Sequence, residues 1–377
     1  MDFVLEVFDH FAFDKLYATV LPSVSTASLD QLAVQASASA TSHASDKVKT
    51  SLAVGVPKLL NMIQNLHSNR SSRYGVEPVF YFPPTEWATQ SILGRDNIIR
   101  QALSLFVVTT IFGWILYLGT AYVSYKTVYD HENFKHPKYL KNQMGMEIAQ
   151  AVSAIPGMTA LTVPWFVAEV QGYGKLYDEL AGNGGWTYLV LSFPLFIMFT
   201  DCLIYMIHRW LHSPSVYKHL HKPHHKWIVS TPFASHAFHP VDGYLQSLPY
   251  HIFPFVFPLQ KFFYLALFGI VNIWTVLIHD GEYLAHDPVV NGSACHTIHH
   301  LYFNYNYGQY TTLWDRLGGT HRTPDKELFD PTARFEDSTY KKQVSQMEKI
   351  QKEVEGDDER VYATSAQKGV QSEVRKR

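Results

Sequence analysis

The chain has 377 residues, the length of one or two domains, and its formal charge of −2 at pH 7 gives no indication of a nucleic-acid partner. Aromatic residues make up 15% of the sequence and charged residues only 17%, which favours a membrane protein with sizeable polar segments. The two cysteines, Cys202 and Cys295, are too few for a disulfide framework.

The first 95 residues differ in character from the rest of the chain. They open with a short amphipathic pattern, "FVLEVFDHFAFDKLY", and continue with a Ser/Ala-rich stretch that is typical of a linker. No series of basic, apolar and cleavage-site segments opens the chain, so we expect no cleaved signal peptide. We expect three regions: a polar and linker region (1–95), a membrane domain (96–324) and a charged tail (325–377).

Three apolar runs follow, each close to the roughly 20 residues that cross a bilayer. They are Leu103–Tyr125, about Ile148–Val170, and Trp186–Ile207. A fourth run, Leu248–Ile278, is too long for one span, and it is interrupted by Pro249, Pro254, Pro258 and the polar pair Gln260–Lys261. Because proline ends or kinks helices, we expect two half-spanning or hairpin helices there.

The distribution of lysine predicts an orientation in the membrane. The loop after the first span holds Lys126, Lys135, Lys138 and Lys141, whereas the next loop holds only Lys175. Positive-inside bias places the first of these loops in the cytosol, although Arg95 and Arg100 act in the opposite sense. The N-terminus and the sequon at Asn69 are then lumenal, and the sequon at Asn291 and the C-terminal tail are cytosolic.

Histidine is the unusual component of this composition, since 14 of the 20 histidines fall between His208 and His300. Three short words carry most of them: "HRWLH", "HKPHH" and "HTIHH". Spacings of three and four residues put side chains on one face of a helix, and Pro223 suggests that a helix starts within the second word. The three words supply eight candidate metal ligands: His208, His212, His221, His224, His225, His296, His299 and His300.

Eight imidazoles exceed the coordination sphere of a single ion, so we expect two metal ions. Zinc patterns built on paired cysteines are missing, and imidazole suits iron, zinc, copper and nickel alike. The position of the histidine words says more about the metal. The words lie at the expected cytosolic ends of apolar helices, where a lipid substrate can enter. A metal pair there favours oxidation of an unactivated C–H bond with redox-active iron and O2.

Further side chains between the words are candidates for additional ligands or for residues that orient the ligands. His239 and His279 are the stronger candidates and His236 is a weaker one. Asp201 and Asp280 lie in or at the edge of apolar runs, where carboxylates are candidates for a functional role. Helix capping or packing is an equally good explanation for both carboxylates.

The order of the three histidine words resembles the fatty acid hydroxylase superfamily of membrane di-iron oxygenases. The surrounding segments "HKPHHKWIVSTPFASHAFHPVDGYLQSLPYHIFPF", "IHDGEY", "CHTIHHLYFNYNYGQYTTLWDRLGGTHR" and "HPKYLKNQ" are similar to the fungal form of a narrower family, the C-5 sterol desaturases. The likeness covers roughly residues 95–324. No histidine word departs from the family pattern.

This resemblance implies an all-α integral membrane enzyme of the endoplasmic reticulum. About four apolar spans or hairpins would carry a cytosolic helical cap with the histidine-rich di-metal site. The enzyme would introduce a C5–C6 double bond into a delta-7 sterol such as episterol, on the route to ergosterol. The eight histidines of the words would hold two irons, O2 would be the co-substrate, and cytochrome b5 with its reductase would deliver electrons from NAD(P)H.

Two alternatives stay open on the sequence. Another enzyme of the same superfamily, such as a C-4 sterol methyl oxidase or a lipid hydroxylase, would use the same metal site. A non-enzymatic membrane protein that binds or transports metal would need polar or charged residues along its spans to form a path, and the first two apolar runs have almost no charged residues.

Overall fold

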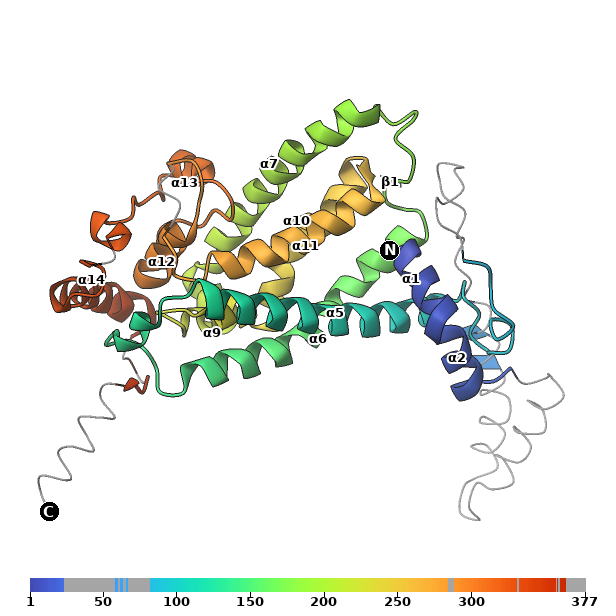
Figure 1. Cartoon of the computed structure of the whole chain (residues 1–377), viewed down its shortest axis with the longest axis horizontal. Helices are drawn as coiled ribbons and strands as arrows, with labels where there is room; N and C mark the ends of the chain where they lie inside the picture. Colours follow the sequence, from blue (N-terminus) through green and yellow to red (C-terminus); the bar gives the residue numbers. More distant parts are fainter. Residues whose placement is uncertain are drawn as a thin grey trace, which may run out of the picture. The chain divides into compact units, whose positions relative to one another are not determined.

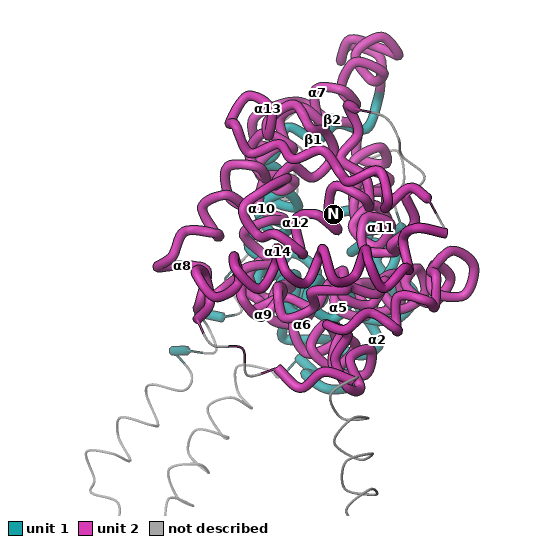
Figure 2. The backbone as a smooth tube through the Cα atoms, turned by 90° about the vertical axis from the view of Figure 1, so that its left-hand side faces the viewer, with its two compact units in different colours: residues 1–108, 163–179 teal, residues 109–162, 180–377 magenta. Residues whose placement is uncertain are grey.

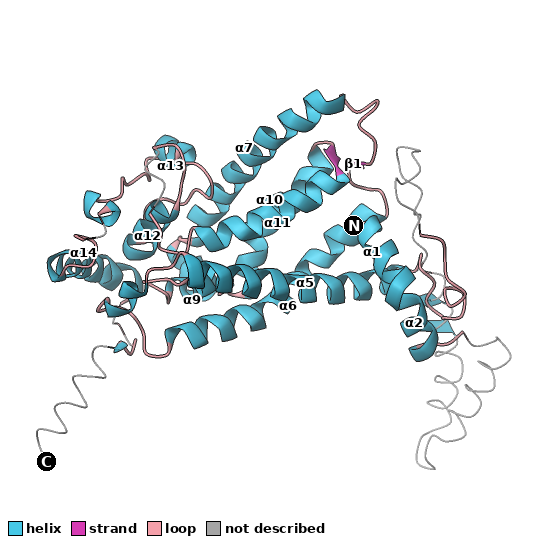
Figure 3. Ribbon diagram, viewed as in Figure 1, coloured by secondary structure: helices cyan, strands magenta, loops and turns pink. Residues whose placement is uncertain are grey.

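The computed structural model describes residues 1–23, 82–283, 288–330, 332–356 and 360–363, together with the separate positions 58, 59, 62, 63, 66 and 358. Helices dominate this part of the chain (Figure 3), which confirms the helical fold class. The described exceptions are two strands of two residues each, β1 (Leu176–Tyr177) and β2 (Leu259–Gln260).

Three described helices are long and apolar enough to cross a membrane: α5 (Ile98–Thr127), α6 (Gln143–Val170) and α7 (Gly185–Leu211) (Figure 1). They contain 30, 28 and 27 residues, so each is roughly 40 to 45 Å long, more than the hydrocarbon core of a bilayer. The three predicted spans are therefore confirmed as helices, and each helix extends a few residues beyond the apolar run that predicted it.

The fourth apolar run forms two helices, as predicted: α10 (Pro240–Val256) and α11 (Lys261–Leu277). The interruption lies elsewhere than at the first two prolines, because α10 continues through Pro249 and Pro254. The chain leaves the helix at Phe257, and the side chain of Gln260 accepts a hydrogen bond from the backbone N–H of Phe263 (2.8 Å), which caps the new helix.

The chain divides into two compact units (Figure 2), which consist of residues 1–108 with 163–179 and residues 109–162 with 180–377. In the first unit, α1 (Asp2–Phe8), the π-helical turn η1 (Asp9–Phe13) and α2 (Asp14–Val20) precede the start of α5. Arg100 is buried there, and its Nη2 atom lies 2.8 Å from a carboxylate oxygen of Asp9 and 2.7 Å from one of Asp14. A buried guanidinium needs such partners, so these ion pairs join the N-terminal helices to α5.

The second unit contains the histidine words. The first word lies at the end of α7, and the second and third lie on the short helices α9 (Lys222–His225) and α12 (Ser293–Tyr302). The other short elements of this unit are η2 (His131–Lys135), α8 (Pro214–Leu220), η3 (Pro232–His236), α13 (Leu313–Gly318) and η4 (Lys326–Phe329). Helix α9 begins one residue before Pro223, close to the predicted start. Proline suits the first turn of a helix because it has no backbone N–H to leave unpaired.

The charged C-terminal segment forms a docked helix, α14 (Asp337–Glu355), which packs against α12 (Figure 1). Met347 is fully buried in a cluster with Ile298 and Leu301 of α12. The charged residues of α14 therefore occupy its outer face, and its apolar face covers the helix that carries the third histidine word.

Candidate metal centre

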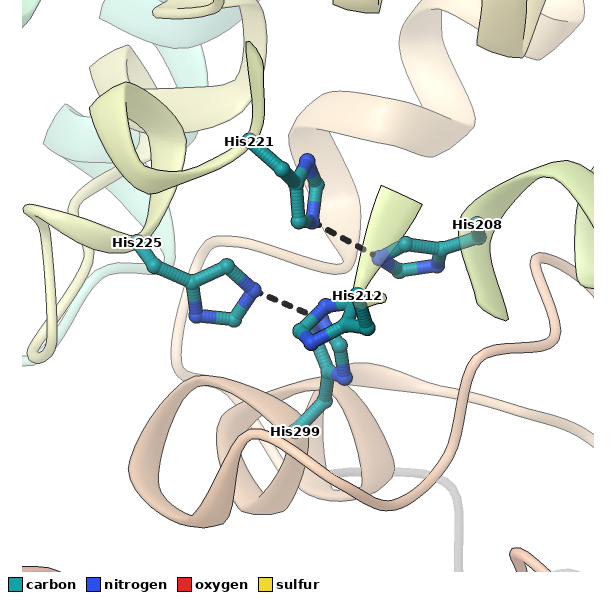
Figure 4. A group of neighbouring side chains, drawn as sticks. All are labelled: His208, His212, His221, His225 and His299. Atoms are coloured by element: carbon teal, nitrogen blue, oxygen red, sulfur yellow. Dashed lines mark hydrogen bonds between the residues drawn. The ribbon is translucent and has the colours of Figure 1, made fainter. Parts of the chain in front are cut away.

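The structure gathers nine histidines of the second unit into two groups, in each of which one ring nitrogen per residue lies within 4.8 Å of the others. The first group contains His208, His212, His221, His225 and His299 (Figure 4). The second group contains His224, His279, His296 and His300. All eight histidines of the three words are present, and the ninth is His279, one of the additional candidates.

In the first group, side chains from three segments converge. His208 and His212 come from the end of α7, His221 and His225 from α9 and its N-cap, and His299 from α12. The Nε2 atoms of His208 and His221 are 3.1 Å apart, and those of His225 and His299 are 3.0 Å apart (Figure 4). Two nitrogens bound at right angles to one ion at ~2.1 Å are separated by roughly 3 Å, so this spacing suits a shared metal ion.

The second group converges in the same way and takes His224 from the second histidine word. The Nε2 atom of His296 lies 2.9 Å from that of His279 and 3.1 Å from that of His300. The Nε2 atoms of His224 and His279 are 3.5 Å apart. Because His224 and His225 are neighbours in sequence but belong to different groups, α9 contributes an imidazole to each candidate metal position.

Four of the nine imidazoles are held by a hydrogen bond at their other ring nitrogen, Nδ1. His208 donates to the carbonyl of Tyr307 (2.9 Å), His299 to that of Tyr305 (2.8 Å) and His279 to that of Thr275 (2.7 Å). His221 donates to a carboxylate oxygen of Asp242 (2.8 Å). Each bond fixes the tautomer that leaves Nε2 free to bind a metal ion, the usual arrangement around metal-binding histidines.

Burial favours the neutral form of seven of these imidazoles, which is the form that binds metal: His212, His224, His225, His279, His296, His299 and His300. Removal from water lowers the pKa of His279 to about 4. It also holds the pKa values of the other six well below the ordinary value for histidine, and repulsion between neighbouring imidazoles is the second cause there. The Nε2 atom of His212 is buried without a hydrogen-bond partner. An unpaired buried nitrogen is costly, and a metal ion bound there would satisfy it, so the residues fit a pair of ions.

Two predicted candidates lie outside both groups. His236 is within hydrogen-bond distance of the side-chain oxygen of Asn272 (3.2 Å) and of the Ser235 hydroxyl (3.1 Å). His239 caps α10 and accepts a hydrogen bond from the backbone N–H of Val241 (3.3 Å). The described contacts of both residues are those of structural side chains.

The predicted carboxylates do not contact the clustered imidazoles through their described hydrogen bonds. Asp201 accepts hydrogen bonds from the backbone N–H groups of Gln309 and Tyr310 and from the hydroxyl of Thr311. Asp280 accepts one from the backbone N–H of Glu282, and burial raises its pKa to about 7. Both residues hold the backbone around the site.

Asp242 is the carboxylate that contacts a clustered imidazole directly, that of His221, and the sequence did not single it out. It is fully buried, and its second oxygen accepts from the side chain of Gln246 (2.8 Å). Asp315 was missed as well: it accepts from the N–H groups of Tyr307 and Gly308 (both 2.8 Å) and so holds the carbonyl that receives His208. The signal for Asp242 was available, since a carboxylate within an apolar segment is a functional candidate by the rule applied to Asp201.

A mainly apolar cavity in the second unit reaches the metal centre. Side chains of α5, α6, α10 and α11 line it, among them Phe112, Ile155, Met158 and Val271. One part of its wall consists of imidazoles from both groups: His208, His224, His279 and His296. An apolar molecule in this cavity would touch the candidate metal positions directly.

Comparisons with known proteins agree with this site. Residues 193–320 match the model of the fatty acid hydroxylase family. The Delta(7)-sterol 5(6)-desaturase of Candida dubliniensis is 51% identical over 96% of this chain and 99% of its own length. The corresponding proteins of Saccharomyces cerevisiae (52% identical, 96% of this chain and 97% of the relative) and Aspergillus fumigatus (51% identical, 98% and 99%) match equally well.

The chain belongs to the Delta(7)-sterol 5(6)-desaturase family. The relatives match almost end to end, so the likeness includes the first 95 residues and the C-terminal tail as well as the histidine words. The segment that matches the fatty acid hydroxylase model contains all nine clustered histidines and Asp242. No solved structure matches the chain.

Proposed function

We propose that this chain is a Delta(7)-sterol 5(6)-desaturase, which removes two hydrogens across C5 and C6 of a delta-7 sterol such as episterol in the synthesis of ergosterol. One observation of the structure carries the proposal: an apolar cavity ends on imidazoles from both histidine groups. The relatives with this name match the chain over nearly their whole length, and this supports the same reaction.

The nine clustered imidazoles would hold two iron ions, and iron with O2 supplies an oxidant strong enough to take hydrogen from an unactivated C–H bond. Overall, the sterol gives up two hydrogens, and O2 takes these with two further electrons and two protons to form two waters. No acid or base of the chain needs to attack the C–H bond.

The side chains of this chain would position the reactants. Phe112, Ile155 and Val271 form flat or branched apolar walls suited to a rigid ring system, and they exclude water from the reacting carbons. Asp242 and the carbonyl of Tyr307 would keep two imidazoles in the tautomer that binds iron.

We further propose that the protein is a multi-pass protein of the endoplasmic reticulum membrane. Its electrons would come from NAD(P)H through a reductase and cytochrome b5. The three long apolar helices support a membrane location, and the need for external electrons supports a carrier partner.

Sterol profiling tests the reaction. The chain is expressed in yeast that lacks its own C-5 desaturase, beside a His299→Ala variant, and sterols are identified by mass spectrometry. We expect ergosterol with the intact chain and delta-7 sterols with the variant. Products heavier by one oxygen would instead indicate a lipid hydroxylase or a C-4 methyl oxidase, and bound iron without any O2 consumption would indicate a metal-binding protein.

A further inference from the structure

A positively charged groove lies beside the second histidine word, away from the apolar cavity. Five cations line it: Lys141, Lys218, Lys222, Lys226 and Arg360. Two carboxylates, those of Glu355 and Asp358, also line it. The groove and the apolar cavity share no lining residue.

The two carboxylates are neutralised by neighbouring cations. Glu355 lies 2.7 Å from Arg360, which also contacts Asp358 at 3.3 Å. Asp358 further pairs with Lys138 (3.5 Å). The positive charge that remains belongs to the four lysines, for which no ion pair with a described carboxylate is present.

The groove reaches the immediate surroundings of the candidate metal ligands. Its wall includes Pro223, the residue between Lys222 and His224 in α9. Arg360 donates a hydrogen bond to the backbone carbonyl of His225 (3.3 Å). A molecule seated in the groove would therefore be separated from one imidazole of each group by about one residue of backbone, ~4 Å of chain.

The proposed reaction needs two electrons from outside the chain, and the next step rests on that proposal. The sequence contains neither the HPGG word of a haem-binding domain nor a GxGxxG fingerprint that opens a strand–helix unit. Electrons must then enter from a docked protein, and a short path to the ligands favours an entry point at α9. A negatively charged carrier would be attracted by the four lysines and oriented on them.

We propose that the groove formed by Lys141, Lys218, Lys222 and Lys226 is the docking site of the electron donor, a one-electron carrier protein with an acidic face. Substrate and electrons would thus reach the metal centre from different sides, the sterol through the apolar cavity and the electrons through α9. Weak, charge-dominated contacts of this kind suit a carrier that must bind and leave at each electron.

The test compares two charge-reversed variants of the full chain in nanodiscs of neutral lipid. Lys141→Glu with Lys218→Glu changes the groove, and these two lysines are exposed and are not next to a clustered histidine in sequence. Lys341→Glu with Lys349→Glu changes two exposed lysines of α14 and is the matched control. The probe is the reduced soluble haem domain of cytochrome b5, and its reoxidation is followed with sterol and O2 at about 50 and about 300 mM salt.

At low salt we expect the groove variant to slow reoxidation by about tenfold or more and to lose most of its salt dependence, while the control stays within about twofold of the unchanged chain. Equal rates in the groove variant and the control would overturn the proposal. A lipid site is the competing outcome: if the groove variant alters only binding to vesicles that contain anionic lipid, the groove binds headgroups and the proposal is wrong.

A single-turnover measurement separates docking from chemistry. The protein is reduced anaerobically with dithionite, freed of excess reductant and mixed with O2 and sterol. Docking predicts equal product from the groove variant and the unchanged chain, with equal iron content. A parallel loss in this assay would show that the lysines act on the metal centre, which contradicts docking. No desaturated sterol from the unchanged chain would instead reject the proposed function.

Discussion

His279 is the side chain whose role the structure changes most. From the sequence it was, like His239, only a candidate for an additional ligand. In the structure its Nε2 atom lies 2.9 Å from that of His296. We expect His279→Ala to lose about one iron per chain, because the second group would keep only three imidazoles. His239→Ala is the matched control and should retain its iron. The iron content of both variants is measured by mass spectrometry. An unchanged iron content in His279→Ala would show that His279 is not a ligand.

Asp242 gives a second prediction at the level of a single atom. Asp242→Asn keeps the shape of the side chain but can turn an N–H toward His221, which loses its charged acceptor. We expect a roughly 10- to 100-fold loss of iron affinity or desaturase activity, as for other residues that orient metal-binding histidines. Asp337→Asn, on the exposed start of α14, is the control. Equal iron affinity in the two variants would assign Asp242 a purely structural role.

The difference between predicted and missed residues has a physical reason. The eight histidines of the words could be grouped from the sequence because helical spacing puts each word on one face. Asp242 lies 21 residues from His221, and only the folding of α10 against the site brings the two together. Asp201 was a reasonable candidate by burial alone, yet its hydrogen bonds go to the 309–311 backbone. The spacing of residues in a sequence predicts which nearby side chains share a helix face. A contact between residues that are distant in the sequence can be predicted only once the fold is known.

At the scale of elements, α6 and α10 approach each other closely beside the apolar cavity. A Cβ atom added at Gly243 would lie 2.1 Å from the sulfur of Met158, and both residues line the cavity. We expect Gly243→Ala to push the Met158 side chain into the cavity and to lower kcat/KM for the sterol by about tenfold, with iron retained. Adding Met158→Ala should restore the space and most of the activity. Failure of this rescue would mean that Gly243 acts on the neighbouring Asp242 instead.

The docking of α14 should depend on pH through His136. This histidine is buried; its Nε2 donates to the Gln343 side chain (3.2 Å) and its Nδ1 accepts from the N–H of Lys138 (3.1 Å). Burial lowers its pKa to about 4. Since an undocked His136 would take up a proton below about pH 6.5, docking is fully stable above that pH and weakens as pH falls toward 4.

Hydrogen exchange of α14, corrected for its intrinsic pH dependence, measures this effect. We expect protection to fall by about tenfold or more between pH 7 and pH 5 in the unchanged chain. His136→Gln cannot take up the proton, so it should show a much flatter profile. Identical profiles would place the pH dependence in another group.

For the whole molecule, the structure alters how the predicted orientation should be tested. The sequon at Asn69 lies outside the described residues, but Asn291 is buried and its side chain donates to the carbonyl of Gly308. The folded structure buries the site that a glycan would need, so an unmodified Asn291 would not by itself report the topology. We expect glycosylation at Asn69 and none at a sequon appended after Arg377, measured by a mass shift on glycosidase treatment. A glycan on the appended sequon would reverse the orientation.

The ion pairs of the first unit bear on the same question. Arg95 and Arg100 were the charges that opposed the predicted orientation, and both are paired with buried carboxylates of the N-terminal helices. Positive-inside bias counts Lys and Arg rather than net charge, so these ion pairs do not remove the two arginines from the count, and the four lysines of the 126–141 loop remain the larger number. Apolar length predicted the three long helices directly, but these long-range ion pairs could not be predicted because Asp9 and Arg100 are distant in sequence.

The docked helix α14 has a consequence for the synthesis of the protein. A ribosome makes the chain from the N-terminus, so α14 is synthesised after the clustered histidines. Until then, the apolar flank of α12 at Ile298 and Leu301 lacks the cover that Met347 of α14 provides. A nascent or truncated chain that ends before residue 337 would present this flank to chaperones and proteases, whereas a finished chain would hide it.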